Sequence, residues 1–293
     1  MAKSPSAQQE LDRMMNIYEK MADSLEERGL DVASIAAVRP HYSIKESGTC
    51  PLQLTELPEP LPPTASRLAV LPLSHCPIHV AAIAEIVQSI RSLLPPGTDV
   101  FCNPPELLHI TLFHMSHPHD PRPCPLDGQA SERAAGQPAA QRRAPTEAEI
   151  HSELALMPHI LGGRAISNVK VDRIQMASSG VLLMLSADHD GTITNIRSRF
   201  HACAPGCPVK QTNIVHSSLL RILTPEQLSK GAIFAINQVC QQWTNKLRGT
   251  QLSLPEAWYI VEDEYANIRG KTYSFSVPAD GTAGRVIQVQ PSA

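Results

Sequence analysis

A pattern of elements that occurs twice in the middle of the chain limits the folds open to this sequence. Each copy contains an apolar stretch typical of a buried strand, then a helical stretch, then a second strand with a histidine in it. The expected elements span residues 67–73, 78–94 and 107–113 in the first copy and residues 181–187, 192–202 and 213–223 in the second. A diverged duplication predicts two similar halves, with room for a site where they face each other.

Each histidine strand is followed by a helix and a further strand. Thr146 and Glu149 have the spacing of a capping box, and Thr224 and Gln227 have the same spacing before a helix expected to end near Leu247. Apolar strands at residues 166–176 and 252–261 are then expected to close the first and the second half. Taken together, these elements predict an α+β protein with two lobes.

Three segments lie outside the duplicated elements. Apolar residues recur at helical spacing from Leu11 to Leu25 and stop before Gly29, which predicts an amphipathic helix that packs on the domain or on a partner. Residues 57–63 (LPEPLPP) predict an extended linker, and residues 117–145 predict a flexible insertion. The predicted organisation is therefore an N-terminal extension and linker (1–64), a main domain (65–280) that contains the insertion, and a tail (281–293).

Composition excludes several classes of protein. Apolar residues make up 42% of the chain, which is enough for a core, and the formal charge of −3 lacks the global positive field that drives binding to double-stranded DNA. No apolar run approaches the roughly 20 residues of a membrane helix, and the seven cysteines show no disulfide-framework spacing. We expect a soluble protein of the cytoplasm or nucleus, without a signal peptide and without a membrane partner.

Four histidines are followed two residues later by Ser or Thr, and two of the four stand out. His109 and His216 are each preceded by two aliphatic residues and have a Leu directly after the hydroxyl residue. Because alternate side chains of a strand share a face, His109 should point the same way as Thr111, and His216 the same way as Ser218. A single such pair is usually an ordinary polar pair, but two at corresponding places of a duplicated pattern favour a site.

The segments HITL (109–112) and HSSL (216–219) resemble the paired signatures of the 2H phosphoesterase superfamily, which includes the LigT-like RNA ligase and cyclic nucleotide phosphodiesterase proteins. The resemblance covers roughly residues 67–277. It implies a duplicated fold in which each lobe is an antiparallel sheet with flanking helices and the active cleft lies between the lobes. It also implies metal-independent hydrolysis of a 2′,3′-cyclic phosphate, or a related phosphodiester, of a nucleotide or RNA end.

That chemistry needs one group to accept a proton from water and another to donate one to the leaving oxygen. His109 and His216 suit both tasks because imidazole is available in both forms near neutral pH, and we favour His216 as the base. Thr111 and Ser218 would bind the phosphate oxygens, and no cofactor is required. Arg221 is a candidate substrate contact or a solvated strand end, and Tyr265 is a candidate substrate contact or a core aromatic residue.

Other interpretations of the sequence remain open. The cluster of His114, His117, His119 and Cys124 fits no standard zinc spacing, so we expect no metal site there. A non-catalytic RNA or nucleotide binder would bind without turnover. An interaction scaffold would use the N-terminal helix and the long loop to engage partners. Removal of residues 1–63 separates the two interpretations: a scaffold would lose association, whereas the enzyme would keep catalysis.

Overall fold

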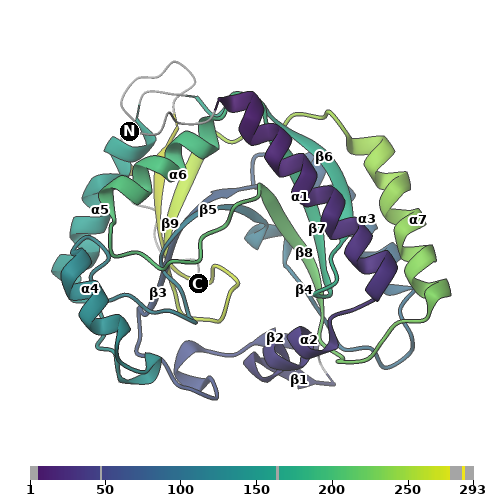
Figure 1. Cartoon of the computed structure of the whole chain (residues 1–293), viewed down its shortest axis with the longest axis horizontal. Helices are drawn as coiled ribbons and strands as arrows, with labels where there is room; N and C mark the ends of the chain where they lie inside the picture. Colours follow the sequence, from purple (N-terminus) through teal and green to yellow (C-terminus); the bar gives the residue numbers. More distant parts are fainter. Residues whose placement is uncertain (1–5, 47, 163–164, 278–285, 288–293) are drawn as a thin grey trace.

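Antiparallel sheets with helices beside them form the fold (Figure 1). The computed structural model describes residues 6–46, 48–162, 165–277 and 286–287. Within these residues, the first sheet has the strand order β11 (Val286–Ile287), β10 (Gly270–Ser276), β9 (Glu256–Glu262), β3 (Ser66–Pro72) and β5 (His109–Ser116). The second has the order β4 (Val100–Cys102), β8 (His216–Ile222), β7 (Val181–Asp188) and β6 (Val169–Met176). The expected α+β class is confirmed.

The two larger sheets share one pairing scheme. Strand β3 lies between β5 and β9, and strand β7 lies between β8 and β6. The expectation that each half closes its own sheet was wrong, because β6 follows the first copy in sequence but pairs with β7, while β9 follows the second copy and pairs with β3. Apolar periodicity identifies a buried strand but carries no information about the strand that it pairs with.

The helices are exchanged in the same way. Helices α3 (Pro77–Arg91) and α7 (Lys230–Leu247) contact each other beside the second sheet, and helices α5 (Glu147–Leu161) and α6 (Thr192–Cys203) contact each other beside the first (Figure 1). The Thr146 capping box is confirmed at the start of α5. The second expected box was wrong, because Ser229 caps α7, while the Thr224 hydroxyl accepts a hydrogen bond from the Asp99 amide.

The N-terminal segment is part of the folded body. Helix α1 (Ala7–Arg28) ends at Gly29 as expected, and it lies across strands β6 and β7 (Figure 1). Met14, Tyr18 and Leu25 are almost fully buried there, and the Tyr18 hydroxyl binds the backbone of β7 and of the residue before β8. The interpretation of residues 1–64 as an extension is therefore corrected: α1 completes the core over the second sheet.

The Pro-rich segment also packs instead of acting as a linker. Leu57 and Leu61 are buried in a small apolar cluster with Tyr42 and Phe101. The short elements of this region are α2 (Val32–Val38), β1 (Tyr42–Lys45), β2 (Gly48–Pro51) and the 3-10 turns η1 (Arg39–His41) and η2 (Leu54–Glu56). A further turn, η3 (Pro105–Leu107), precedes β5.

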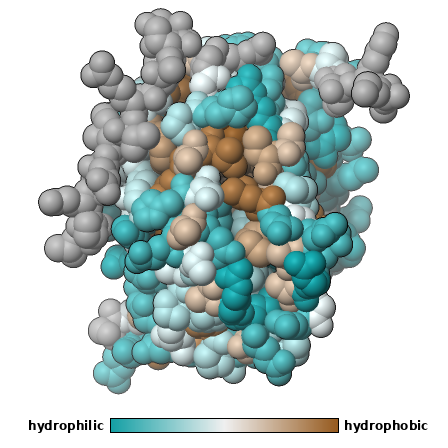
Figure 2. Space-filling view, turned by 90° about the vertical axis from the view of Figure 1, so that its left-hand side faces the viewer, coloured by the Kyte–Doolittle hydropathy of each residue, from teal (hydrophilic) through white to brown (hydrophobic). Residues whose placement is uncertain are grey.

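The segment 117–145, which we expected to be flexible, contains helix α4 (Gly128–Ala135) and the turn η4 (Ala139–Gln141). Asp120 forms ion pairs with Arg122 and Arg142, and the buried Arg67 donates a hydrogen bond to the Arg122 carbonyl at 2.7 Å. Such polar contacts are invisible to a search for apolar periodicity. Figure 2 shows the face formed on this side of the molecule, where hydrophilic side chains surround an apolar area.

The expected tail (281–293) lies outside the described residues except for β11, which pairs with β10. Among the described helices, none combines the length and the apolar composition that a membrane crossing needs.

Candidate active site

The two histidine strands meet between the larger sheets. Residues of β5 and β8 approach within 8 Å, measured between Cα atoms, although the strands belong to different sheets. A cavity of about 230 Å³ opens at this contact. Its lining includes five of the six residues expected from the sequence, namely His109, Thr111, His216, Ser218 and Arg221. The geometry therefore brings together the histidine and the hydroxyl residue of both copies.

A β-bulge at the same place in both strands shapes the cavity. In the pairing of β3 with β5 the register skips Leu112, and in the pairing of β7 with β8 it skips Leu219. Each bulge follows directly after the hydroxyl residue and reverses the alternation of faces beyond it. Arg221 would otherwise point away from His216, five residues earlier, and the bulge turns it to the cavity.

The first bulge has the same effect on a residue that sequence reasoning did not select for the site. His114 lies five residues after His109 and lines the cavity at the place that corresponds to Arg221. The pairing partners of these two residues, Leu68 and Val181, also line the cavity. A signal was present in the sequence, because two adjacent apolar residues follow Thr111 and again follow Ser218, where regular alternation would place one.

The His109 ring is half-buried and has a defined tautomer. Its Nδ1 lies 2.8 Å from the Leu107 carbonyl oxygen. Since a carbonyl only accepts, Nδ1 carries the proton in the neutral ring, and the lone pair is on Nε2. Burial lowers the pKa of His109, and the hydrogen bond to Leu107 acts in the opposite direction. The ring can therefore gain a proton at Nε2 while it keeps the contact that orients it.

His216 is held in a different environment. Its Nδ1 is buried and has no hydrogen-bond partner among the described residues. The backbone of Ile214 nevertheless favours the protonated ring and raises its pKa. Burial lowers the pKa of His216 to about 4, and the positive charge of Arg197 contributes in the same direction. At neutral pH this imidazole is therefore uncharged, as a general base must be.

Further titratable groups face the same cavity. Burial lowers the pKa of His114 well below its usual value and that of His117 to about 4, so both rings are neutral at pH 7. The buried Glu262 carboxylate accepts hydrogen bonds from Ser66 and from the backbone, and burial raises its pKa to about 7. No described carboxylate lies within 4 Å of the Arg221 guanidinium, which leaves Arg221 as a cation that can receive an anion.

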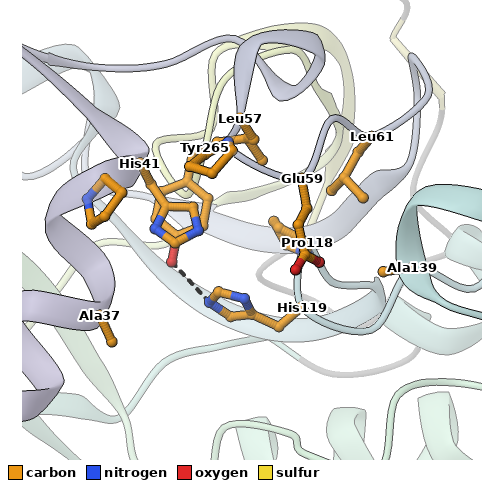
Figure 3. A pocket seen from close by; sticks show the side chains of 11 residues that line it. Ala37, His41, Leu57, Glu59, Leu61, Pro118, His119, Ala139 and Tyr265 are labelled. Atoms are coloured by element: carbon orange, nitrogen blue, oxygen red, sulfur yellow. Dashed lines mark hydrogen bonds between the residues drawn. The ribbon is translucent and has the colours of Figure 1, made fainter.

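Tyr265, the sixth expected residue, does not line this cavity. It lies in a neighbouring cavity of about 310 Å³, where its hydroxyl is 2.9 Å from His119 Nε2 and its ring stacks on His41 at 4.4 Å between centroids (Figure 3). Burial raises the pKa of Tyr265 to about 12. Pro118 lines both cavities, so the two are adjacent.

The histidine cluster at the end of β5, formed by His114, His117 and His119, is not joined by Cys124, the cysteine that made a zinc site conceivable. The rings of His114 and His117 are in edge contact at 4.8 Å, and His119 lies beyond them, whereas Cys124 lines a different cavity. Among the residues that the structure describes, no group of three or more His, Cys, Asp or Glu side chains is placed to hold a metal ion.

Fold and site together define an α+β protein whose antiparallel sheets meet at a cavity with a histidine from each copy of a duplicated pattern. No family model and no curated protein matches the chain. Among solved structures it is similar to a conserved protein of unknown function from Agrobacterium tumefaciens strain C58. The two share 14% sequence identity over 82% of this chain and 94% of that one, with a TM-score of 0.48.

Proposed function

We propose that the protein is a metal-independent phosphodiesterase of the 2H type that hydrolyses a 2′,3′-cyclic phosphate, or a related phosphodiester, of a nucleotide or RNA end. In this proposal the two larger sheets are the two lobes, and the enzyme acts in the cytoplasm or nucleus. The observation that carries the proposal is the shared cavity, because it collects the histidine and the hydroxyl of both copies beside Arg221, which has no described carboxylate within 4 Å.

The reaction needs only groups that line the cavity. His216, uncharged at neutral pH, accepts a proton from water while the water oxygen attacks phosphorus. The bond from phosphorus to one ribose oxygen breaks, and protonated His109 donates its Nε2 proton to that oxygen, which leaves a phosphomonoester. The negative charge of the bound phosphate raises the pKa of His109, and the Leu107 carbonyl also favours the protonated ring.

The remaining groups stabilise the phosphate. The Thr111 and Ser218 hydroxyls donate hydrogen bonds to the non-bridging oxygens, and Arg221 balances their charge. The adjacent cavity provides room for the rest of the substrate, with Tyr265 and His41 as the rings against which it packs. The contribution of Tyr265 is therefore to substrate affinity and not to the proton transfers.

The decisive test is hydrolysis of 2′,3′-cyclic nucleotides by the purified protein in the presence of EDTA. We expect turnover with a bell-shaped pH profile, and a loss of roughly 10²-fold or more in kcat for His109→Ala and for His216→Ala. The matched control is His151→Ala, because His151 is exposed on α5 and should leave turnover unchanged. Turnover by either active-site variant at the wild-type rate would rule out the two-histidine mechanism, and binding without turnover would favour the nucleotide-binding alternative.

A further inference from the structure

One arginine joins the two histidine strands to each other. Arg197 on α6 donates from Nη2 to the Thr111 carbonyl at 2.8 Å and from Nε to the Leu112 carbonyl at 3.0 Å, both on β5. The same Nη2 donates to the Ile214 carbonyl at 2.9 Å, two residues before His216. A single guanidinium therefore holds the bulge of β5 and the entry to β8.

The contact suits the edge position of β5. No other described strand pairs with the outer edge of β5, so the carbonyls on that edge have no partner strand. The bulge at Leu112 also interrupts the regular hydrogen bonding of β5 with β3. A guanidinium offers five donors in a planar fork, which lets one side chain reach three carbonyls on two segments. An ammonium group is a compact point charge and does not reproduce that fork.

The corresponding place in the other copy is held by a neutral residue. The carbonyl of Ser218 accepts a hydrogen bond from the Asn103 side chain at 2.7 Å, and the Leu219 carbonyl accepts one from the Asn103 backbone at 3.0 Å. The bulge carbonyls of both histidine strands are thus satisfied from outside their strands, but only on β5 does a cation provide the hydrogen bonds.

Among the described residues, no carboxylate lies within 4 Å of the Arg197 guanidinium. Burial lowers the pKa of Arg197 to about 10, which still leaves it charged at neutral pH, while the more distant Asp188 and Glu10 favour its charged form. Its charge lowers the pKa values of His216 and His114. His109 and Arg221 also lower the pKa of His216, whereas the Ile214 carbonyl raises it.

We propose that Arg197 is a positioning residue of the histidine site, which fastens β5 to the entry of β8 and thereby sets the separation of the His109 and His216 rings. The catalytic consequence rests on the proposed function, whereas the fastening itself does not. Because the cation stands beside His216 without a carboxylate, it also opposes protonation of that ring until a phosphate brings negative charge into the cavity.

The experiment compares Arg197→Lys and Arg197→Met with Arg199→Lys and Arg199→Met. Arg199 lies two residues further along on the same helix and also binds two backbone carbonyls, of Ile160 at 3.2 Å and Gly162 at 2.9 Å, away from the histidine strands. We expect both Arg197 variants to lower kcat for a 2′,3′-cyclic nucleotide by roughly 10²-fold, with a smaller change in KM. A loss of this size is typical when a catalytic group is displaced by about an ångström, as we expect for the two histidine rings. The Arg199 variants should retain wild-type kcat.

Histidine titration by NMR, without ligand and with inorganic phosphate, gives a readout that needs no activity. In Arg197→Met the titration midpoint of His216 should rise, because the cation is gone, and in Arg197→Lys it should stay near the wild-type value. Arg197→Lys with wild-type kcat, or Arg197→Met with an unshifted His216, would overturn the inference. If the wild type shows no turnover, the proposed function fails, and the His216 titration alone decides whether Arg197 acts on the histidine site.

A measurement on the wild-type protein tests the inference even if the Arg197 variants do not fold. The Nε proton of Arg197 is bonded to a carbonyl inside the fold, so its exchange with solvent should be slow compared with that of the exposed Arg28. Exchange as fast as that of Arg28 would show that the fastening does not exist in solution.

Discussion

At the scale of single residues, a buried ion pair supports the first sheet, whose strand β5 carries His109. The side chains of Arg67 on β3 and Glu153 on α5 are both fully buried and pair at 2.9 Å. The Tyr259 hydroxyl donates to the same carboxylate, and the Arg67 guanidinium also donates to the carbonyls of Thr64 and Arg122. This network attaches α5, the segment before β3 and the segment after β5 to one guanidinium.

We expect Glu153→Gln to lower the free energy of unfolding by about 3–5 kcal/mol, because it leaves the buried charge of Arg67 without its counter-charge. Urea unfolding followed by circular dichroism would measure the change. The control is Glu147→Gln on the exposed first turn of the same helix, which should change the free energy by less than about 0.5 kcal/mol. A loss no larger than that of the control would contradict the view that this pair is a supporting contact.

At the scale of elements, the attachment of α1 is the contact most relevant to the site. The Tyr18 hydroxyl accepts from the Val215 amide at 3.2 Å and lies 2.8 Å from the Ser186 carbonyl, so it binds β7 and the residue immediately before His216. Tyr18→Phe should lower the free energy of unfolding by about 1–3 kcal/mol, since it leaves buried backbone groups with fewer partners.

The measurement is a urea midpoint. Tyr273→Phe is the control, since Tyr273 is also buried but its hydroxyl makes no hydrogen bond to the described backbone of a histidine strand. A chain without residues 1–63 should unfold or aggregate, and it should not retain the catalysis that the sequence-based boundary predicted. A truncated chain with wild-type stability would show that α1 is an accessory helix after all.

The elements also show where sequence reasoning succeeded and where it stopped. The Thr146 box caps its helix because both bonding partners lie within one turn of the chain. The same spacing at Thr224 failed because Thr224 and Gln227 bond to distant segments, at Asp99 and Leu30. Periodicity located the strands, whereas the exchange of β6 and β9 depends on long-range pairing that periodicity does not encode.

In the candidate site, too, local patterns were found from the sequence and long-range contacts were missed. His109, Thr111, His216 and Ser218 were found because strand alternation is local and the pattern occurs twice. The bulges that bring His114 and Arg221 to the cavity interrupt that alternation, and Arg197 lies on a helix whose own periodicity says nothing about the strands it binds. Residues that act by joining distant segments have no signature in a single sequence.

At the scale of the whole molecule, buried titratable groups make stability depend on pH in two opposite directions. His216 and His117 have pKa values of about 4 in the fold, against about 6.5 when unfolded, so the unfolded chain binds more protons between these values. Their contribution to stability is complete above pH 6.5 and is lost as the pH falls toward 4. His114 acts in the same direction.

Glu262 acts in the opposite direction. Its pKa is about 7 in the fold and about 4.5 when unfolded, so the folded chain keeps a proton that the unfolded chain has released. This contribution is complete below pH 4.5 and is lost as the pH rises through 7. Since several histidines oppose one carboxylate, stability should rise from pH 4.5 to 6.5, less steeply than the histidines alone would give, and change little above pH 7.

Urea midpoints measured from pH 5 to pH 8.5 would test this balance. Glu262→Gln should steepen the rise between pH 5 and pH 7, because the amide resembles the protonated carboxyl, does not titrate, and can still bond to Ser66 and the Ile268 amide. His117→Gln should reduce the slope on the acid side, by at most about 1.4 kcal/mol per pH unit. A Glu262→Gln protein with the wild-type slope between pH 5 and pH 7 would show that Glu262 does not oppose the histidines there. Glu256→Gln, at the half-exposed other end of β9, serves as the matched control.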